Sequence, residues 1–195
     1  MKLLPNLANY QIILGSQSPR RRQLLSDLGI DFIQRSKAVE ESYPTDIAKA
    51  EVPLYLSQKK AAAFKDELLA DQLLITSDTV VILEDRILEK ASSYAEAEEM
   101  LKSLSGKMHQ VVSGTSLTTK AQQISFAETT KVFFKPLSEA EIAYYLEVFQ
   151  PYDKAGAYGI QEWIGFIGVE KIEGCYYNVM GLPLSSLYEK LKAIV

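Results

Sequence analysis

Short apolar runs and segments of helical spacing follow one another along the first part of the chain. Residues 12–14 (Ile-Ile-Leu) and 73–77 (Leu-Leu-Ile-Thr-Ser) have the length of buried strands, and we expect the second of these to be central. Residues 23–28 have apolar positions at helical spacing and stop at a glycine, which predicts a short helix. A further strand is expected at 31–33, and a longer amphipathic helix at 54–69.

The second part of the chain has longer strand signals, and its helices begin at capping motifs. Residues 80–83 continue extended, and Glu84-Asp85 predicts a tight turn into a strand at 86–88. Alternating apolar and polar residues predict paired strands at 109–117 and 124–134. The remaining expected elements are helices after Ser93 and Ser138, a strand at 166–172, glycine-rich loops at 153–161 and 176–184, and a last helix at 185–194.

The composition is that of a folded protein with one sizeable core. The 195 residues are 47% hydrophobic and 24% charged, and we expect one domain over residues 1–195. A net charge of −4 disfavours general binding to nucleic acid. The single cysteine, Cys175, excludes an internal disulfide and suits a reducing cytoplasm. Neither a signal peptide nor an apolar run of membrane-spanning length is evident, so we expect a cytoplasmic location and no membrane partner.

Residues 15–22, Gly-Ser-Gln-Ser-Pro-Arg-Arg-Arg, connect the first strand to the first helix. Ser18 suits the N-cap of that helix, and Pro19 suits its first position. Free amides and the positive end of the helix dipole would then lie beside three arginines, which favours a polyanion such as a phosphate chain. Arginines on a first helical turn often simply face water, so the motif alone leaves both interpretations open.

Several other polar residues have two interpretations as well. Asp78 stands between two apolar runs, and because burying an unpaired carboxylate is costly, we expect it to cap a turn or to lie at a strand end facing a ligand. By themselves, Glu41 in an acidic pair and Lys60 on a helix are typical of a solvated surface. His109, the only histidine, is interpreted as structural. Without a second histidine, Mg²⁺ and Mn²⁺ with oxygen ligands remain the candidate metal ions.

Together these segments resemble the Maf family of nucleoside triphosphate pyrophosphatases, which has also been linked to septum formation. The resemblance extends over most of the chain, with the family's motifs in order. These are Ser16-Gln17-Ser18-Pro19-Arg20-Arg21, Glu41-Ser42, Lys60-Ala61, Ser77-Asp78-Thr79-Val80-Val81, Leu104-Ser105-Gly106, residues 153–161 and Asn178-Val179-Met180-Gly181-Leu182-Pro183. The chain departs from the family at Ala91, where a proline is frequent, and at Glu162, where a glycine is frequent.

The resemblance implies the α/β fold that Maf proteins share with the inosine triphosphatases. That fold has a long mixed β-sheet with flanking helices and two lobes around a central cleft. The implied enzyme activity is hydrolysis between the α and β phosphates of a nucleoside triphosphate, which yields a nucleoside monophosphate and pyrophosphate. A divalent cation, Mg²⁺ or Mn²⁺, is the implied cofactor.

The family's functional residues can be carried over position by position. Those implied to hold phosphate oxygens are Ser16, Arg20 and Arg21. Those implied to act in catalysis are Asp78, Glu41, Lys60 and Lys90. Asp78 is the expected general base, and Glu41 and Asp78 would also bind the metal ion. Whether the carboxylate or the metal ion activates the water stays open at this point.

The residues expected to set substrate choice are those of the family branch that prefers dTTP and UTP. In this chain they are Arg20, Thr79 and Gln161. An amide such as that of Gln161 both donates and accepts, which matches the carbonyl and imide edge of thymine or uracil. The branch that prefers 7-methyl-GTP has tryptophan, an Asp-Gln pair and a Ser-Glu-like pair at the corresponding places, and a cationic base favours a carboxylate and an aromatic face.

Three other interpretations predict different behaviour. A nucleotide-binding regulator of septation would bind tightly without turnover, and it would not need the carboxylate Asp78. A 7-methyl-GTP pyrophosphatase would keep the chemistry and change the base. An RNA-binding module using Arg20 to Arg22 would need a wider basic surface than a chain of net charge −4 provides. The expected partner is therefore a small nucleoside triphosphate, and a homodimer is compatible with the family resemblance.

Overall fold

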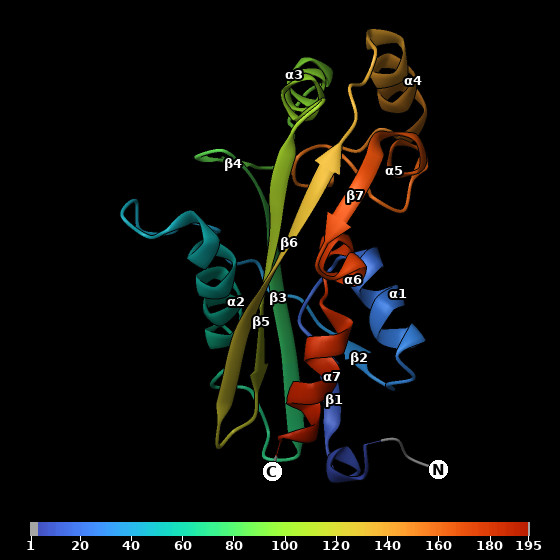
Figure 1. Cartoon of the computed structure of the whole chain (residues 1–195). Helices are drawn as coiled ribbons and strands as arrows, with labels where there is room; N and C mark the ends of the chain where they lie inside the picture. The colour runs from blue at the N-terminus through green and yellow to red at the C-terminus, as the bar shows by residue number, and fades with distance from the viewer. Residues whose placement is uncertain (1–3, 195) are drawn as a thin grey trace. The chain divides into compact units, whose positions relative to one another are not determined.

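The strands of the computed structural model, which describes residues 4–194, form one seven-stranded sheet (Figure 1). They are β1 (Gln11–Leu14), β2 (Ile33–Gln34), β3 (Gln72–Leu83), β4 (Arg86–Leu88), β5 (Met108–Thr118), β6 (Gln123–Phe134) and β7 (Val169–Glu173). Their order is β2-β1-β3-β5-β6-β7, and β4 pairs with β3. Since β1 pairs in parallel with β2 and β3, whereas β3–β4 and β6–β7 are antiparallel, the sheet is mixed. The expected α/β fold with a mixed sheet is confirmed.

In the described part of the chain, three of the seven α-helices begin where the capping motifs predict. The helices are α1 (Pro19–Asp27), α2 (Val52–Ala62), α3 (Tyr94–Leu104), α4 (Glu139–Phe149), α5 (Trp163–Gly168), α6 (Tyr176–Met180) and α7 (Leu184–Lys192), with 3-10 helices η1 (Pro5–Leu7) and η2 (Lys49–Glu51). The side chains of Ser18, Ser93 and Ser138 each accept a hydrogen bond from the backbone amide three residues further on. No helix within residues 4–194 is long and apolar enough to cross a membrane.

The chain divides into two compact units that share three strands. Unit 1 contains the chain up to Asp78, Ser113–Glu128 and the part from Gly181 onward, and unit 2 contains Thr79–Val112 and Thr129–Met180. Strands β3, β5 and β6 each continue from one unit into the other. One domain over residues 1–195 stays a prediction.

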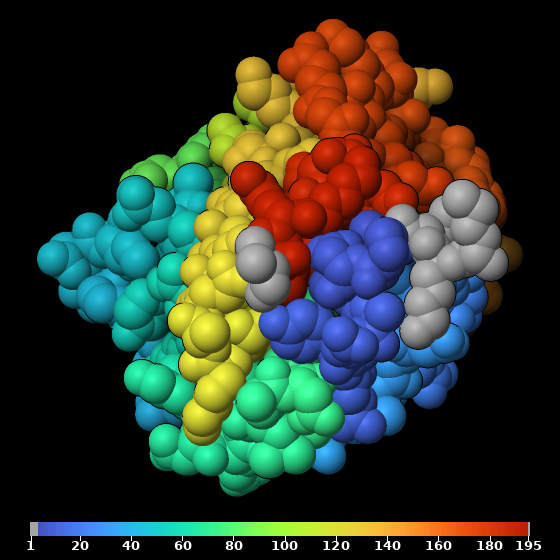
Figure 2. Space-filling view, turned by 90° about the horizontal axis from the view of Figure 1, so that it is seen from below, coloured from blue at the N-terminus to red at the C-terminus, as the bar shows by residue number. Residues whose placement is uncertain are grey.

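Unit 1 is built around the parallel strands β1 and β3. Ile13 and Leu74 pack with Ala61 of α2 and with Phe64 and Leu68, which follow that helix. Near the N-terminus, the Asn6 side chain donates to the carbonyls of residues 191 and 194 at the C-terminal end, each at 2.9 Å. Figure 2 shows this N-terminal segment in blue beside the C-terminal helix in red. These contacts tie the two ends of the described chain together.

Unit 2 has the larger cluster of buried apolar side chains. Helices α3 and α4 pack together. Their buried leucines and one isoleucine belong to the same apolar cluster as the side chains of β3, β5 and β6 that lie in unit 2. Within this core, His109 is 1% exposed and contacts the rings of Phe134 and Tyr158 edge to face. Its Nε2 lies 2.7 Å from the Tyr158 hydroxyl. The histidine therefore belongs to the core, as expected.

Several expected elements are wrong in part. The loop expected over 176–184 contains the helix α6, and the strand expected at 31–33 lies at Ile33–Gln34. The helix expected over 54–69 ends at Ala62, because the chain then forms three-residue turns that still carry Phe64 into the core. The strand expected over 166–172 begins only at Val169 and follows α5. In α5, Ile164 and Gly168 are buried at helical spacing, with Ile167 partly buried beside them. Tertiary packing thus selects a helix where the local composition favours a strand.

Candidate active site

The loop before α1 is organised around the buried hydroxyl of Ser16. This side chain is 8% exposed, and its Oγ accepts from the Ser18 amide at 3.2 Å. The loop approaches β3 closely at Gly15, where a Cβ would lie 2.8 Å from the Thr76 side chain. Ser18 caps α1, and Pro19 occupies its first turn. The predicted strand-turn-helix start is confirmed, with the Ser16 hydroxyl beside the first turn of α1.

Arg21 is held in place by neutral oxygens from two parts of unit 1. Its Nε donates to the Gly181 carbonyl at 2.8 Å, and its Nη1 donates to Ser16 Oγ at 3.4 Å. Burial lowers the pKa of Arg21, the charge of Asp78 opposes this, Arg20 lowers the pKa further and Glu41 raises it. Arg21 therefore lies within electrostatic reach of Arg20 and of both predicted catalytic carboxylates. The contact with Gly181 was not anticipated, although the Asn178–Pro183 motif marked this segment.

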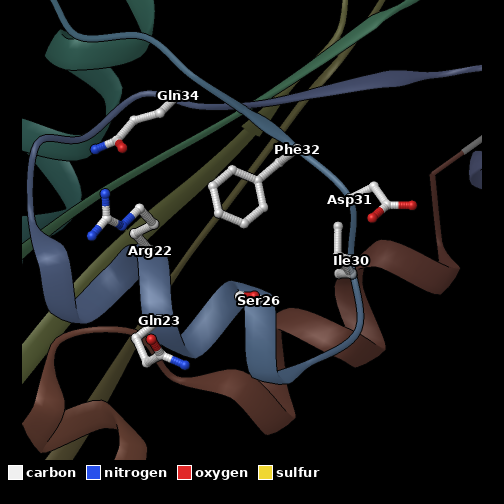
Figure 3. A pocket seen from close by; sticks show the side chains of 7 residues that line it. All are labelled: Arg22, Gln23, Ser26, Ile30, Asp31, Phe32 and Gln34. Carbon is white, nitrogen blue, oxygen red and sulfur yellow. The ribbon is translucent and has the colours of Figure 1, made fainter.

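Arg22 does not join the other arginines. It lines a separate pocket of about 420 Å³ between α1 and the segment that leads into β2 (Figure 3). The Phe32 ring lies in the middle of this view, and the Gln34 side chain lies near Arg22. Successive residues of a helix point about 100° apart, so three consecutive arginines cannot share one direction. The expectation of three arginines at one spot is wrong for Arg22.

Lys60 joins the two carboxylates that the family pattern singles out. Its Nζ lies 2.5 Å from Oδ1 of Asp78 and 2.7 Å from Oε1 of Glu41. The side chain of Asp78 is 11% exposed and that of Lys60 is 17% exposed, whereas Glu41 is 52% exposed. Neighbouring Lys59 donates to the carbonyl and the hydroxyl of Ser42, both at 2.9 Å. Helix α2 thus fixes the loop that carries Glu41.

Asp78 occupies a different place from the one expected. It lies within the unbroken strand β3, neither at a turn nor at a strand end. A carboxylate is tolerated there because Lys60 neutralises it. The strand beside it is fixed by buried hydroxyls: Thr76 Oγ1 donates to the Ser57 carbonyl at 2.8 Å, and Ser77 Oγ donates to the Gly114 carbonyl at 2.9 Å.

Glu41 and Asp78 form a donor set that suits a divalent cation shared with a substrate. Mg²⁺ is commonly bound by one or two carboxylates and completes its coordination with water and phosphate oxygens. Within residues 4–194, no group of three His, Cys, Asp or Glu side chains gathers to hold an ion. The residues therefore fit an Mg²⁺ or Mn²⁺ ion that depends on ligands from outside the protein.

The other predicted site residues belong to unit 2. Thr79 follows Asp78 on β3 and is half-buried, as is Gln161, while Lys90 is exposed. Lys90 forms a β-bridge with Ala155, and the Gly156 amide donates to the carbonyls of residues 88 and 89, both at 3.1 Å. The structure therefore brings Lys90 beside the loop 153–161 that ends at Gln161.

Two comparisons bear on the whole chain. The family model for Maf-like proteins matches residues 11–194, and the chain belongs to the Maf family. A protein of Bacteroides thetaiotaomicron named dTTP/UTP pyrophosphatase is 52% identical over 193 residues, which cover 98% of this chain and 100% of that protein. A protein of the same name from Phocaeicola vulgatus is 50% identical over 193 residues, with 98% and 100% covered. The family resemblance inferred from the motifs is confirmed.

A third comparison, with solved structures, gives only a weak likeness. The Staphylococcus aureus Ham1 protein matches 64% of this chain and 71% of its own, with 17% identity and a TM-score of 0.41. A likeness at this level places no individual residue.

Proposed function

We propose that this chain hydrolyses dTTP and UTP to the nucleoside monophosphate and pyrophosphate. The observation that carries the proposal is the position of Lys60 between Glu41 and Asp78, with Arg21 in electrostatic reach of both carboxylates. The relatives named dTTP/UTP pyrophosphatase align over nearly the whole chain at about half identity, which supports the same substrate class.

The phosphate chain would be bound by the start of α1 and by lysines. Ser16 and Arg21 offer hydrogen-bond donors at the start of α1, and the guanidinium group suits paired phosphate oxygens. Arg20 adds positive charge next to Arg21. Lys60 and Lys90 would act as point charges that stabilise the negative charge developing on the phosphates.

Asp78 is the group best suited to accept a proton from the attacking water. Its side chain is only 11% exposed and is oriented by Lys60, so it is both shielded and fixed. Glu41 and Asp78 would together hold Mg²⁺ or Mn²⁺. When bound, such an ion polarises the phosphate and makes its bound water more acidic.

Thr79 and Gln161, with Arg20, would set the preference for a pyrimidine. The half-buried amide of Gln161 can donate to a carbonyl of thymine or uracil and accept from its imide. Cytosine lacks that imide, so it should be a poorer substrate. A 7-methyl-GTP preference is disfavoured, because the family branch with that preference has other residues at these positions.

A nucleotide-binding regulator without turnover remains the alternative from another class, and a role in septum formation would be compatible with either. The free cysteine Cys175 is consistent with the cytoplasmic location that we propose. We also propose a homodimer, on the family resemblance alone.

The proposal is tested by pyrophosphate release from dTTP, UTP, CTP, GTP and 7-methyl-GTP, each with Mg²⁺ or Mn²⁺. Release from dTTP and UTP above the others is expected. Turnover of 7-methyl-GTP instead would preserve the chemistry and overturn the specificity. Tight nucleotide binding with no release from any substrate would favour the regulator.

A further inference from the structure

The loop 153–161, which ends at Gln161, is held by hydrogen bonds to a buried tyrosine of unit 2. Tyr145 of α4 is fully buried, and its hydroxyl accepts a hydrogen bond from the Gly159 amide at 2.9 Å. The same hydroxyl donates to Oε2 of Glu162. Burial and the neighbouring Glu162 carboxylate raise the pKa of Tyr145, which keeps the hydroxyl protonated. One hydroxyl thus binds residues on both sides of Gln161.

A buried ion pair closes the same loop from its start to its end. Oε1 of Glu162 lies 3.0 Å from Nζ of Lys154, which also contacts Asp153 at 2.7 Å. Lys154 is only 8% exposed. A buried ammonium group is unfavourable unless it is paired, so the pairing strongly disfavours other positions of Lys154 and Glu162.

The Glu162 side chain also packs directly on the loop backbone. The backbone amide of Glu162 donates to the Gly159 carbonyl at 2.9 Å. A Cβ at Gly159 would lie 2.8 Å from the carboxylate carbon of Glu162, so the loop backbone and the carboxylate can approach this closely only with glycine there. The carboxylate has partners on both oxygens and backbone beneath it, which leaves the loop little freedom.

We propose that Tyr145 and Glu162 are positioning residues that hold Gln161 in the orientation needed to select the base. This inference rests on the proposed function, in which Gln161 contacts the pyrimidine. Neither residue is assigned a contact with substrate, and both act through the loop backbone. Selection by hydrogen bonds depends on fixed donors and acceptors, so loosening the loop impairs base selection more than it impairs phosphate chemistry.

The test is Tyr145→Phe, which keeps the buried ring and removes only the hydroxyl. The ratio of kcat/KM for dTTP to that for CTP should fall about tenfold, with a smaller change in kcat at saturating dTTP. Hydrogen exchange of the peptide around residues 155–165 should become faster, because the Gly159 amide loses its acceptor. Tyr144→Phe is the matched control: it makes the same chemical change at a neighbouring side chain that is 48% exposed, and both readouts should stay as in the wild type.

A second pair of variants separates positioning from mere folding. Glu162→Gln keeps an acceptor for the Tyr145 hydroxyl and should retain most of the base selectivity, whereas Glu162→Ala should lose it to the extent that Tyr145→Phe does. Unchanged exchange in Tyr145→Phe, or faster exchange with unchanged selectivity, would overturn the proposal. Wild-type protein that releases no pyrophosphate from any nucleotide would instead overturn the proposed function, and with it this inference.

Discussion

Each unit of the molecule contains a lysine between two carboxylates, and the two arrangements differ in how firmly they are held. In unit 1, Lys60 joins Asp78 to Glu41, which belongs to an irregular loop and is 52% exposed. In unit 2, Lys154 joins Asp153 to Glu162, whose other oxygen accepts from the buried hydroxyl of Tyr145.

The difference indicates two kinds of use for the same residue types. Glu41 can exchange its partner for water or a cation at little cost, because its side chain is already half exposed to solvent. Glu162 cannot leave without removing one of the two carboxylates that pair with buried Lys154 and the acceptor of the buried Tyr145 hydroxyl. The first arrangement suits chemistry, and the second suits the fixing of a loop.

The largest effect is expected for Asp78→Asn, which tests whether the arrangement in unit 1 acts in catalysis. The change keeps the shape of the side chain and removes its ability to accept a proton, so kcat should fall about 100-fold or more. Pyrophosphate release from dTTP measures this effect. Asp66→Asn, at an exposed carboxylate of the same unit, is the control and should retain wild-type kcat. Equal activity of the two variants would contradict the role of Asp78.

Replacing each lysine by methionine compares the two arrangements directly. Lys60→Met should lower kcat/KM about 100-fold and the free energy of unfolding by about 3 kcal/mol, because buried Asp78 loses the partner that neutralises it, whereas exposed Glu41 can be solvated. Lys154→Met should lower the free energy of unfolding by about 3 kcal/mol, because it breaks a buried pair, with a smaller loss of kcat. Urea unfolding and steady-state kinetics on both variants provide the data. A larger loss of kcat/KM for Lys154→Met than for Lys60→Met would reverse our interpretation.

The core of unit 2 should make stability depend on pH. Burial lowers the pKa of His109 from 6.5 to about 4, so the unfolded chain takes up the proton first as the pH falls. The contribution of His109 is fully present above pH 6.5 and is lost as the pH falls toward 4, which amounts to about 3 kcal/mol.

Urea unfolding at pH 7, 5.5 and 4 measures this loss. His109→Gln can still pair with the Tyr158 hydroxyl but does not titrate, so its stability should decline less steeply over this range. Identical slopes for the variant and the wild type would show that other groups are responsible.

The smallest expected effect concerns the arginines of α1. Arg21→Lys removes the fork that reaches Gly181 and Ser16 together, so KM for dTTP should rise about tenfold. Arg22→Lys, one position further on the same helix, alters only the lining of the other pocket and should leave KM unchanged. Equal values of KM for the two variants would place the phosphate contact elsewhere.

The parts of the fold that depend on neighbouring residues were predictable from the sequence. Ser18 and Ser138 cap their helices because the cap and the capped amide lie three residues apart. The helix α5 was missed because its burial depends on packing against other elements of unit 2. The continuity of β3 through Asp78 was missed because the neutralising lysine lies 18 residues away in sequence.

The candidate site shows the same limit. Motifs singled out Asp78, Glu41 and Lys60, yet only the structure shows that one lysine serves both carboxylates. The fastening of Glu162 by Tyr145 joins residues 17 apart in sequence, and its only signal was a glutamate where relatives often have glycine.

The proposed activity is tested most directly by identifying the bond that is broken in dTTP. We would follow wild-type turnover of dTTP in the presence of Mg²⁺ by phosphorus NMR. Cleavage between the α and β phosphates predicts that dTMP and pyrophosphate appear together in equal amounts. Formation of dTDP and inorganic phosphate would contradict it, because cleavage would then fall between the β and γ phosphates.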